Sequence, residues 1–472
     1  MVASPVPTGD LLADLRAAEA RHDLFTYAVD GWSAWRVMRN AIYRTAAAWP
    51  LAGDTRSDMT RALWALVGTL KLARVLAFPK RTEILVKTAR SGLRMSFGER
   101  YRDVYFDGLL ATTPDHFKLE EINTPDFDRQ ARAAMFPGDL NPVVFTFWGR
   151  VLGKLCPAPA ADFCVRVSAI LRDEIGVAIS ADALLMRVST AWWQSRMYRP
   201  LLQRLRPRVV LVSDTGEYGL LIACAKLGVP VVELQHGVFD AAHPDAIPAT
   251  APGAREHLVL VDALASRGSY WIGKLAGTHQ AARAVAVGNE LIDVAREKRA
   301  ARPPSTGRHI VLTSQGLDSK RLAAWVAQMI ASAPAGLDWR LSVKLHPVYD
   351  AGSRCFDEVA LSPRVTLVPG GAEPNVFDLL ADADLHLSIA SACHFDALAL
   401  GVPTVVVPLI GHEGVIDAVD GRRMFIAESP AQVWSLNTHE WPEEESREFS
   451  EAGFLDNMNR LIDGLKARGR YA

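Results

Sequence analysis

Residues 384–407 read Asp-Leu-His-Leu-Ser-Ile-Ala-Ser-Ala-Cys-His-Phe-Asp-Ala-Leu-Ala-Leu-Gly-Val-Pro-Thr-Val-Val-Val. This pattern predicts a buried strand, a turn of small residues, a short helix that stops at Gly-Val-Pro, and a second buried strand. Residues 209–234 repeat the pattern, with Ser-Asp-Thr-Gly-Glu in the turn and Leu-Gly-Val-Pro at the helix end. Because strands that alternate with helices form parallel sheets, the two units predict two α/β domains.

The remaining chain alternates in the same way. Strand-like runs are expected at 83–87, 117–122, 208–212, 231–234, 257–261 and 284–287, and again at 309–313, 341–345 and 364–368, with helices between most of them. Residues 9–80 have a helical pattern. We therefore predict a helical extension over 1–82, two Rossmann-like doubly wound domains over 83–288 and 289–440 that face a central cleft, and closing helices over 441–472.

Composition limits the class of protein. With 472 residues the chain exceeds one ordinary core, and 49% hydrophobic with 22% charged residues is the usual globular balance. A net charge of -1 gives no indication of a nucleic-acid partner. The five cysteines form no CxxC pair, so neither a zinc site nor a disulfide framework is expected, and we predict a cytoplasmic protein.

One apolar segment, residues 63–78, is interrupted by Lys71 and Arg74, and no uncharged run reaches the length of a membrane span. Two interpretations remain open for residues 61–81. The segment is either a basic amphipathic helix on the inner face of the cytoplasmic membrane or a helix packed on its own domain. The first interpretation rests on the flanking residues Arg61, Trp64, Lys80 and Arg81.

Polar motifs follow two of the expected strands. Gln235, His236 and Gly237 come after the strand at 231–234, and Lys344, His346 and Pro347 end the strand at 341–345. Ligands of open α/β sheets bind beyond the carboxyl ends of the strands. The first motif offers an amide, an imidazole and a close backbone approach, and the second offers two groups that suit a phosphate. The alternatives are a His236 that satisfies a loop carbonyl, and a surface Lys344 beside a capped His346.

Turns before helices supply further candidates. Ser314 and Gln315 follow the strand at 309–313, and Ser388 and Ser391 lie in the turn quoted first. Backbone N–H groups and hydroxyls at such turns suit an anion. In the first domain, Asp214 or Glu217 is a candidate general base, although Ser, Asp and Thr are also common helix caps. The sequence has no GxGxxG at a first strand, no GxxxxGK[ST], no HExxH and no GxSxG, and we expect no metal requirement.

These residues resemble those of GT-B glycosyltransferases of bacterial surface and capsular polysaccharide biosynthesis. The likeness covers residues 205–410 and rests on Gln235-His-Gly, on Lys344-Leu-His-Pro and on the Ser388 to Pro403 unit. The most similar group is the sialyl-, polysialyl- and Kdo-transferases that use CMP-sugars, and the CDP-glycerol glycerophosphotransferases share the pattern. The resemblance implies an acceptor domain over 83–288 and a nucleotide-sugar donor domain over 289–440.

The resemblance also assigns roles. His346 and the serine turn would hold the donor phosphate, and Asp214 would be the base. Asp396 stands where the family often has Glu. Residue chemistry and the resemblance together give the candidate catalytic residues Asp214, Glu217 and His236. The candidate nucleotide-binding residues are Gln235, Gly237, Ser314, Gln315, Lys344, His346, Pro347, Ser388, Ser391 and Asp396.

The expected function is transfer of a sugar, sialic acid-like or Kdo-like, from a CMP-linked donor to a hydroxyl of a capsule, lipopolysaccharide or related glycan. No cofactor is expected, and the partners are the nucleotide-sugar and a glycan or lipid-linked glycan. Three alternatives stay open: a UDP-sugar 2-epimerase of GT-B fold, a CDP-glycerol glycerophosphotransferase, and a non-catalytic glycan-binding member.

Overall fold

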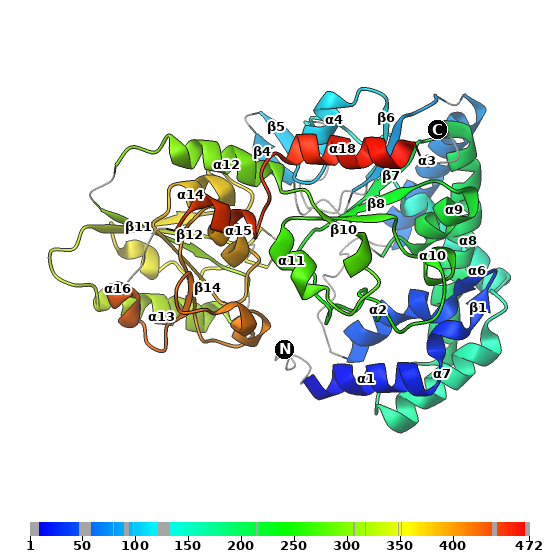
Figure 1. Cartoon of the computed structure of the whole chain (residues 1–472), viewed down its shortest axis with the longest axis horizontal. Helices are drawn as coiled ribbons and strands as arrows, with labels where there is room; N and C mark the ends of the chain where they lie inside the picture. Colours follow the sequence, from blue (N-terminus) through cyan, green and yellow to red (C-terminus); the bar gives the residue numbers. More distant parts are fainter. Residues whose placement is uncertain are drawn as a thin grey trace.

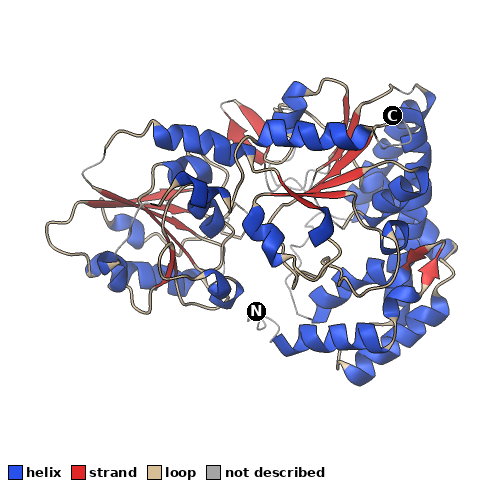
Figure 2. Ribbon diagram, in the orientation of Figure 1, coloured by secondary structure: helices blue, strands red, loops and turns tan. Residues whose placement is uncertain are grey.

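Two six-stranded parallel sheets with helices on both faces form the molecule, as the expected GT-B fold class requires (Figures 1 and 2). The computed structural model describes residues 9–46, 58–78, 80–88, 94–97, 99–120, 133–213, 216–304, 307–316, 318–347, 349–350, 352–436 and 441–467. Among these residues, no helix is both long and apolar enough to cross a bilayer.

The first sheet has the strand order β10-β9-β8-β7-β3-β6. All neighbouring strands are parallel. Its strands are β3 (Ile84–Lys87), β6 (His116–Leu119), β7 (Val209–Val212), β8 (Val231–Leu234), β9 (Ala263–Ser266) and β10 (Ala284–Ala286). The chain passes from β3 to β6 on one side and then to β7 on the other. The order therefore reverses between β3 and β7, where ligands of open α/β sheets bind.

The second sheet has the order β13-β12-β11-β14-β15-β16, which is the 3-2-1-4-5-6 order of Rossmann domains. Its strands are also all parallel. They are β11 (Arg308–Thr313), β12 (Trp339–Lys344), β13 (Val365–Val368), β14 (Leu385–Ser388), β15 (Thr404–Val406) and β16 (Met424–Ile426). Here the order reverses between β11 and β14.

Period-two alternation explains how both faces of each sheet are buried. On β11, Ile310 and Leu312 lie in one hydrophobic cluster and Val311 in another. On β7, Val210 and Val212 face the N-terminal helices, while Val209 and Leu211 face the opposite layer. A strand buried on both faces needs a continuous apolar run, which is the feature that made these strands predictable.

Helices cover these faces (Figure 2). Both Gly-Val-Pro helix stops are confirmed, because Gly228 and Gly401 adopt left-handed φ angles of 65° and 71°. The helices are α1 (Gly9–Arg21), α2 (Ala34–Ala46), α3 (Asp58–Ala77), α4 (Asp107–Thr112), α6 (Val143–Leu155), α7 (Ala161–Glu174), α8 (Ala181–Leu205), α9 (Tyr218–Leu227), α10 (Arg255–Leu258), α11 (Ser269–Lys274), α12 (Glu290–Ala300), α13 (Ser319–Ala331), α14 (Val376–Ala381), α15 (Cys393–Ala399), α16 (Gln432–Ser435), α17 (Glu443–Arg447) and α18 (Phe454–Lys466).

The last helix returns to the first sheet. In Figure 1, α18 (red) leaves the unit formed by the second sheet and runs across the unit formed by the first. Its apolar residues Phe454, Met458 and Ile462 pack in one cluster with strands β3, β7, β8 and β9. The backbone N–H of Phe454 donates to Asp293 on α12 at 2.8 Å. The chain therefore crosses between the two units twice, once at α12 and once before α18, and side chains also join the units.

One expected strand is wrong, and some elements were not foreseen. Residues 258–261 are buried, but α10 ends at Leu258 and Val259 adopts a left-handed φ of 50°. The apolar run packs in the helical layer instead of joining the sheet. Two antiparallel hairpins also form outside the sheets, β1 (Ala28–Val29) with β2 (Trp32–Ser33) and β4 (Arg94–Phe97) with β5 (Arg100–Asp103).

Candidate active site at the facing strand ends

An ion pair joins the carboxyl-end edges of the two sheets. Arg267, directly after β9, donates through Nη1 to Oδ1 of Asp396 on α15 at 2.6 Å. Both side chains are largely buried, at 12% and 7% exposed. Burial raises the pKa of the Asp396 carboxyl, and the neighbouring Arg267 opposes that rise. The predicted nucleotide-binding residue Asp396 is thus bound by an arginine of the first domain.

Gln235 belongs to the same connection. Its Oε1 accepts from the backbone N–H of Arg267 at 3.1 Å and from the hydroxyl of Ser266 at 2.9 Å, and its Nε2 donates to the carbonyl of Gly237 at 2.9 Å. The amide of Gln235 therefore ties the ends of β8 and β9 together and orients Arg267. Its Oε1 is thus used within the domain, and one of the two N–H groups of Nε2 is used by Gly237.

A small pocket opens beside this connection. Its polar residues are Tyr105, Gln235, Arg267, Asn289 and Glu290, and Val104, Leu234, Gly288 and Phe454 complete the lining. Arg102 on β5 pairs with Glu290 at its edge. Since the Nε of Arg267 is buried with no hydrogen-bond partner among the described residues, this boundary holds a cationic donor that an anion can satisfy.

The rest of the Gln-His-Gly motif lies on the loop after β8. His236 is half-buried, and its carbonyl accepts from the Tyr105 hydroxyl at 3.3 Å. A Cβ atom added at Gly237 would meet no atom within 4 Å. The space beside Gly237 is therefore open, as a close approach by a ligand requires.

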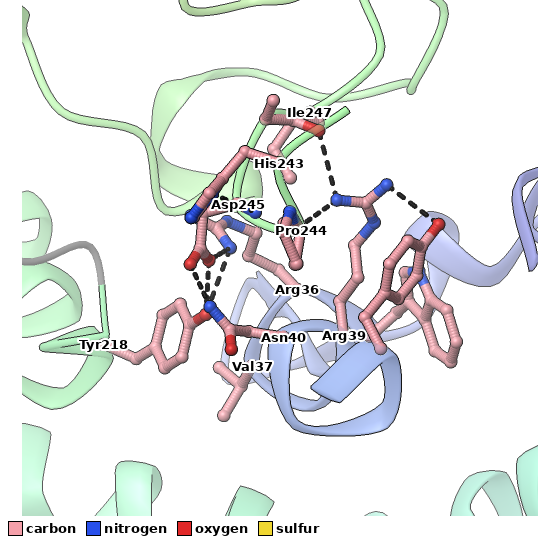
Figure 3. A network of polar contacts seen from close by, with 12 residues as sticks. Arg36, Val37, Arg39, Asn40, Tyr218, His243, Pro244, Asp245 and Ile247 are labelled. Atoms are coloured by element: carbon pink, nitrogen blue, oxygen red, sulfur yellow. Dashed lines mark hydrogen bonds and ion pairs between the residues drawn. The ribbon is translucent and has the colours of Figure 1, made fainter. Parts of the chain in front are cut away.

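A buried polar network holds this loop against the N-terminal helices (Figure 3). Arg36 on α2 donates to Asp245 at 2.6 Å and to the Tyr218 hydroxyl at 3.2 Å, and that hydroxyl donates to Asp245 at 2.7 Å. Asn40 donates to the other oxygen of Asp245. Burial alone would raise the pKa of Asp245, but Arg36, His243 and the hydrogen bonds hold it well below its usual range.

A second cation on the same helix extends the network. Arg39 pairs with Glu19 on α1 and donates to the carbonyls of Pro244 and Ala246. Nearby, burial lowers the pKa of His243 to about 4, so its ring is neutral at pH 7 and its Nδ1 accepts from the backbone N–H of Asp245 at 3.1 Å. The helical extension is thus a structural part of the first domain, because it fixes the loop that carries His236.

The switch point of the first sheet holds an ion pair. Lys87 at the end of β3 lies 2.5 Å from the carboxylate of Glu217, which precedes α9. Lys87 is 5% exposed and Glu217 is 24% exposed. Glu217 therefore lies in the predicted turn before α9, and its carboxylate pairs with Lys87. The candidate base Asp214 lies outside the described residues.

At the switch point of the second sheet, Ser314 and Gln315 follow β11. Oε1 of Gln315 accepts from the backbone N–H of Ala390, in the turn after β14, at 2.8 Å. Ser314 is 4% exposed, and its hydroxyl has no hydrogen-bond partner among the described residues. An unsatisfied buried hydroxyl costs about 1–3 kcal/mol, which a polar ligand at this edge would recover.

The serine turn itself is largely occupied. Ser388 is fully buried and its hydroxyl donates to the carbonyl of Thr313 at 2.7 Å. The Ser391 hydroxyl accepts from the backbone N–H of Cys393, the first residue of α15, at 3.1 Å. Behind the turn, Thr404 contacts both His386 and His394 through its hydroxyl, at 2.7 and 2.6 Å. Ser388 and Ser391 thus both have hydrogen-bond partners within the domain.

Lys344, at the end of β12, binds backbone carbonyls of the loop at 369–374. Its ammonium donates to the carbonyls of Pro369, Ala372 and Pro374 at 3.0, 2.7 and 3.0 Å. An ammonium has three N–H donors, so this loop uses all of them. Burial lowers the pKa of Lys344 to about 8, and Asp378 partly opposes the shift. Lys344 therefore positions the loop at 369–374.

His346 lies at the edge of the same strand end. Its Nδ1 accepts from the backbone N–H of Tyr349 at 3.1 Å, and its backbone N–H donates to Asp350 at 2.8 Å. The rings of His346 and Tyr349 lie 4.6 Å apart. Burial lowers the pKa of His346. Pro347 packs closely on Gly370, where an added Cβ would come within 2.3 Å of its Cα atom.

The structure therefore brings the predicted residues to two facing strand-end edges, but it adds groups that the sequence analysis missed. Arg267 and Lys87 each complete an ion pair with a predicted residue, and neither belongs to a recognised motif. The sequence indicates these two residues only by their place, since Lys87 ends β3 and Arg267 directly follows β9. No cluster of three or more His, Cys, Asp or Glu side chains is arranged to hold a metal ion within the described part of the chain.

The strand orders and the facing edges define a two-domain, Rossmann-like protein of the GT-B type. No protein-family model matches the sequence, and no curated protein does. Among solved structures, the UDP-GlcNAc 2-epimerase of Methanocaldococcus jannaschii is 13% identical, with 81% of this chain and 99% of that chain covered and a TM-score of 0.45. The wall teichoic acid polymerase TagF is 12% identical, with 87% and 99% covered and a TM-score of 0.45. At these values the fold assignment rests on the topology of the chain itself.

Proposed function

We propose that the chain is a glycosyltransferase that moves a sugar from a nucleotide donor, CMP-linked, to a hydroxyl of a bacterial surface glycan without a metal cofactor. The observation that carries the proposal is the meeting of two carboxyl-end strand edges at the Arg267–Asp396 pair. In open α/β sheets these edges bind ligands, and two facing edges suit a reaction between two substrates.

The nucleotide belongs at the second sheet in this proposal. The unbonded hydroxyl of Ser314 and the imidazole of His346 flank the ends of β11 and β12, and the Nε of Arg267 faces the boundary. These donors would offset charge on the leaving phosphate. Lys344, Ser388 and Gln315 contribute by holding the turns that surround them.

The acceptor belongs at the first sheet. Glu217, or Asp214 in the same turn, would take the proton of the acceptor hydroxyl, which requires a carboxylate within hydrogen-bond reach of that proton. Lys87 would position Glu217 through their ion pair. His236 follows β8, beside the open space at Gly237, and would supply an imidazole at this edge.

Nucleotide binding tests the proposal. The melting temperature of the wild type, Ser314→Ala and His346→Ala is measured with CMP, CDP, UDP, GDP and dTDP, since a ligand at about 100 times its Kd stabilises the native state by about 2.7 kcal/mol. We expect a shift with CMP that both variants lose. Ser435→Ala, an exposed serine on α16, is the control and keeps the shift.

Donor chemistry separates the alternatives. Turnover of a UDP-sugar without an acceptor would favour an epimerase, and turnover of CDP-glycerol would favour glycerophosphate transfer. Inertness with every nucleotide would leave a glycan-binding protein. Activity that survives a chelator is expected, and its loss would contradict the metal-independent reaction.

A further inference from the structure

One face of α3 carries large apolar side chains in solvent. Leu63, Leu66, Val67 and Leu70 are 60%, 57%, 44% and 67% exposed, and Phe78, after the helix, is 81% exposed. The spacing i, i+3, i+4, i+7 places the four helical residues on one side. We refer to these five residues as the α3 apolar face.

The opposite side of α3 is packed on the protein. Ala65 is fully buried, and an added Cβ at Gly68 would lie 3.0 Å from the Cβ of Val144 on α6. The Trp148 indole donates to the Thr69 hydroxyl at 2.9 Å. The helix is therefore anchored in the layer formed with α6 and α8 at the edge of the first unit (Figure 1), and its outward side is the apolar one.

This concentration differs from the other exposed apolar groups. Within the described ranges, five of the 14 large hydrophobic side chains that are exposed lie between residues 63 and 78, and the others are scattered over the remaining chain. Isolated exposed apolar residues are normal, but a contiguous patch indicates an interaction surface.

Charge around the face identifies the occupant. The sequence from Met59 to Thr82 contains no Asp or Glu, and its cations are Arg61, Lys71, Arg74, Lys80 and Arg81. Lys71 and Arg74 are exposed on the helix itself, and Lys80 and Arg81 follow it. A second copy of this chain would set these cations against one another, whereas anionic headgroups would neutralise them.

We propose that the α3 apolar face docks on an anionic lipid bilayer. The leucines and Phe78 would enter the boundary between headgroups and acyl chains, and the cations would remain among the lipid phosphates. α3 would then lie in the plane of the membrane surface, with the first unit held against it. This proposal is independent of the nucleotide chemistry, because it needs only the surface of α3.

Vesicle flotation of the full chain, without nucleotide, tests the docking. The vesicles contain phosphatidylcholine alone or phosphatidylcholine with phosphatidylglycerol. We expect the wild type to float with the anionic vesicles and to remain behind with the neutral ones. Leu66→Ser/Leu70→Ser is expected to weaken binding about tenfold or more, and Lys71→Gln/Arg74→Gln to weaken it about tenfold or more on anionic vesicles only.

The control variant Val165→Ser/Leu361→Ser removes two apolar groups that are 60% and 83% exposed elsewhere, and it is expected to bind like the wild type. Melting temperatures check that each variant is folded. Failure of the folded wild type to bind anionic vesicles would overturn the proposal, as would equal binding by the Leu66→Ser/Leu70→Ser variant. A dimer in solution that this variant converts to a monomer, without vesicle binding, would assign the face to a second copy instead.

Discussion

Arg267 and Asp396 lie 129 positions apart in the sequence, and their side chains meet at 2.6 Å across the boundary of the two units. Arg267 is oriented by the amide of Gln235, so one hydrogen-bonded path leads from the first domain's Gln-His-Gly motif to the helix after the serine turn of the second. Two motifs that the sequence presents separately are therefore parts of one connection, and changes in it are expected to affect both domains.

Arg267→Ala is expected to destabilise the boundary. The substitution leaves the Asp396 carboxyl buried without its cation, and breaking a buried pair in this way costs about 3 kcal/mol. Since Arg267 opposes the rise in the pKa of Asp396, that pKa will rise further in the variant. Calorimetry measures the loss as a lower melting temperature.

The matched control for this prediction is Arg354→Ala, which removes an arginine that is 89% exposed and pairs with Asp357. It is expected to leave the melting temperature unchanged. Adding Asp396→Asn to Arg267→Ala is expected to recover part of the lost stability. Equal melting temperatures for Arg267→Ala and the wild type would contradict a stabilising role for the pair.

The pH dependence of stability reports on His243. Its pKa is about 4 in the folded protein against 6.5 as the ordinary value, so the unfolded chain binds the extra proton first as pH falls. Stability is therefore lost as pH drops from about 6.5 to about 4, by about 3 kcal/mol for this group. Asp245, whose pKa is held low, contributes a further loss as pH falls below its ordinary value near 4.

Urea unfolding at several pH values isolates this effect when the wild type is compared with His243→Asn, which retains an acceptor but does not titrate. We expect a smaller slope between pH 6.5 and 4 in the variant. The comparison is needed because burial also lowers the pKa of His386 and of His394, and both act in the same direction. An unchanged slope would contradict burial of a neutral His243.

Lys344→Met is expected to loosen the loop at 369–374. The carbonyls of Pro369, Ala372 and Pro374 lose their shared donor, and a buried acceptor left unsatisfied costs about 1–3 kcal/mol. Faster amide hydrogen exchange in this loop and a lower melting temperature are the measurements. Lys320→Met, at an exposed lysine on α13, should change neither. Normal exchange in Lys344→Met would contradict the positioning role.

Tyr218→Phe tests the network of Figure 3 with a minimal change. The variant keeps the ring but removes the hydroxyl between Arg36 and Asp245, which is expected to cost about 1–2 kcal/mol of stability. Limited proteolysis should also cut the loop at 236–247 more rapidly. Tyr349→Phe, at a tyrosine that is 56% exposed, provides the comparison and is expected to be neutral in the stability measurement.

The sequence alone predicted most strands of the two sheets, because strands buried on both faces need continuous apolar runs. It missed β9 (Ala263–Ser266) and β16 (Met424–Ile426). The helix stops at Gly228 and Gly401 were equally visible, since a left-handed residue favours glycine. The strand expected at 257–261 was wrong because burial against helices selects the same apolar residues as burial in a sheet.

Tertiary structure decided which polar residues meet and which are already occupied. Lys344 and Ser388 have types that suit a phosphate, but their donors go to carbonyls from segments distant in the sequence. Arg267 and Lys87 belong to no recognised motif. Their ion-pair partners follow from the positions of the strands that they end. Local sequence thus determined the elements, because propensity and periodicity act over neighbouring residues, while the pairing of charges depended on long-range contacts that only the assembled sheets create.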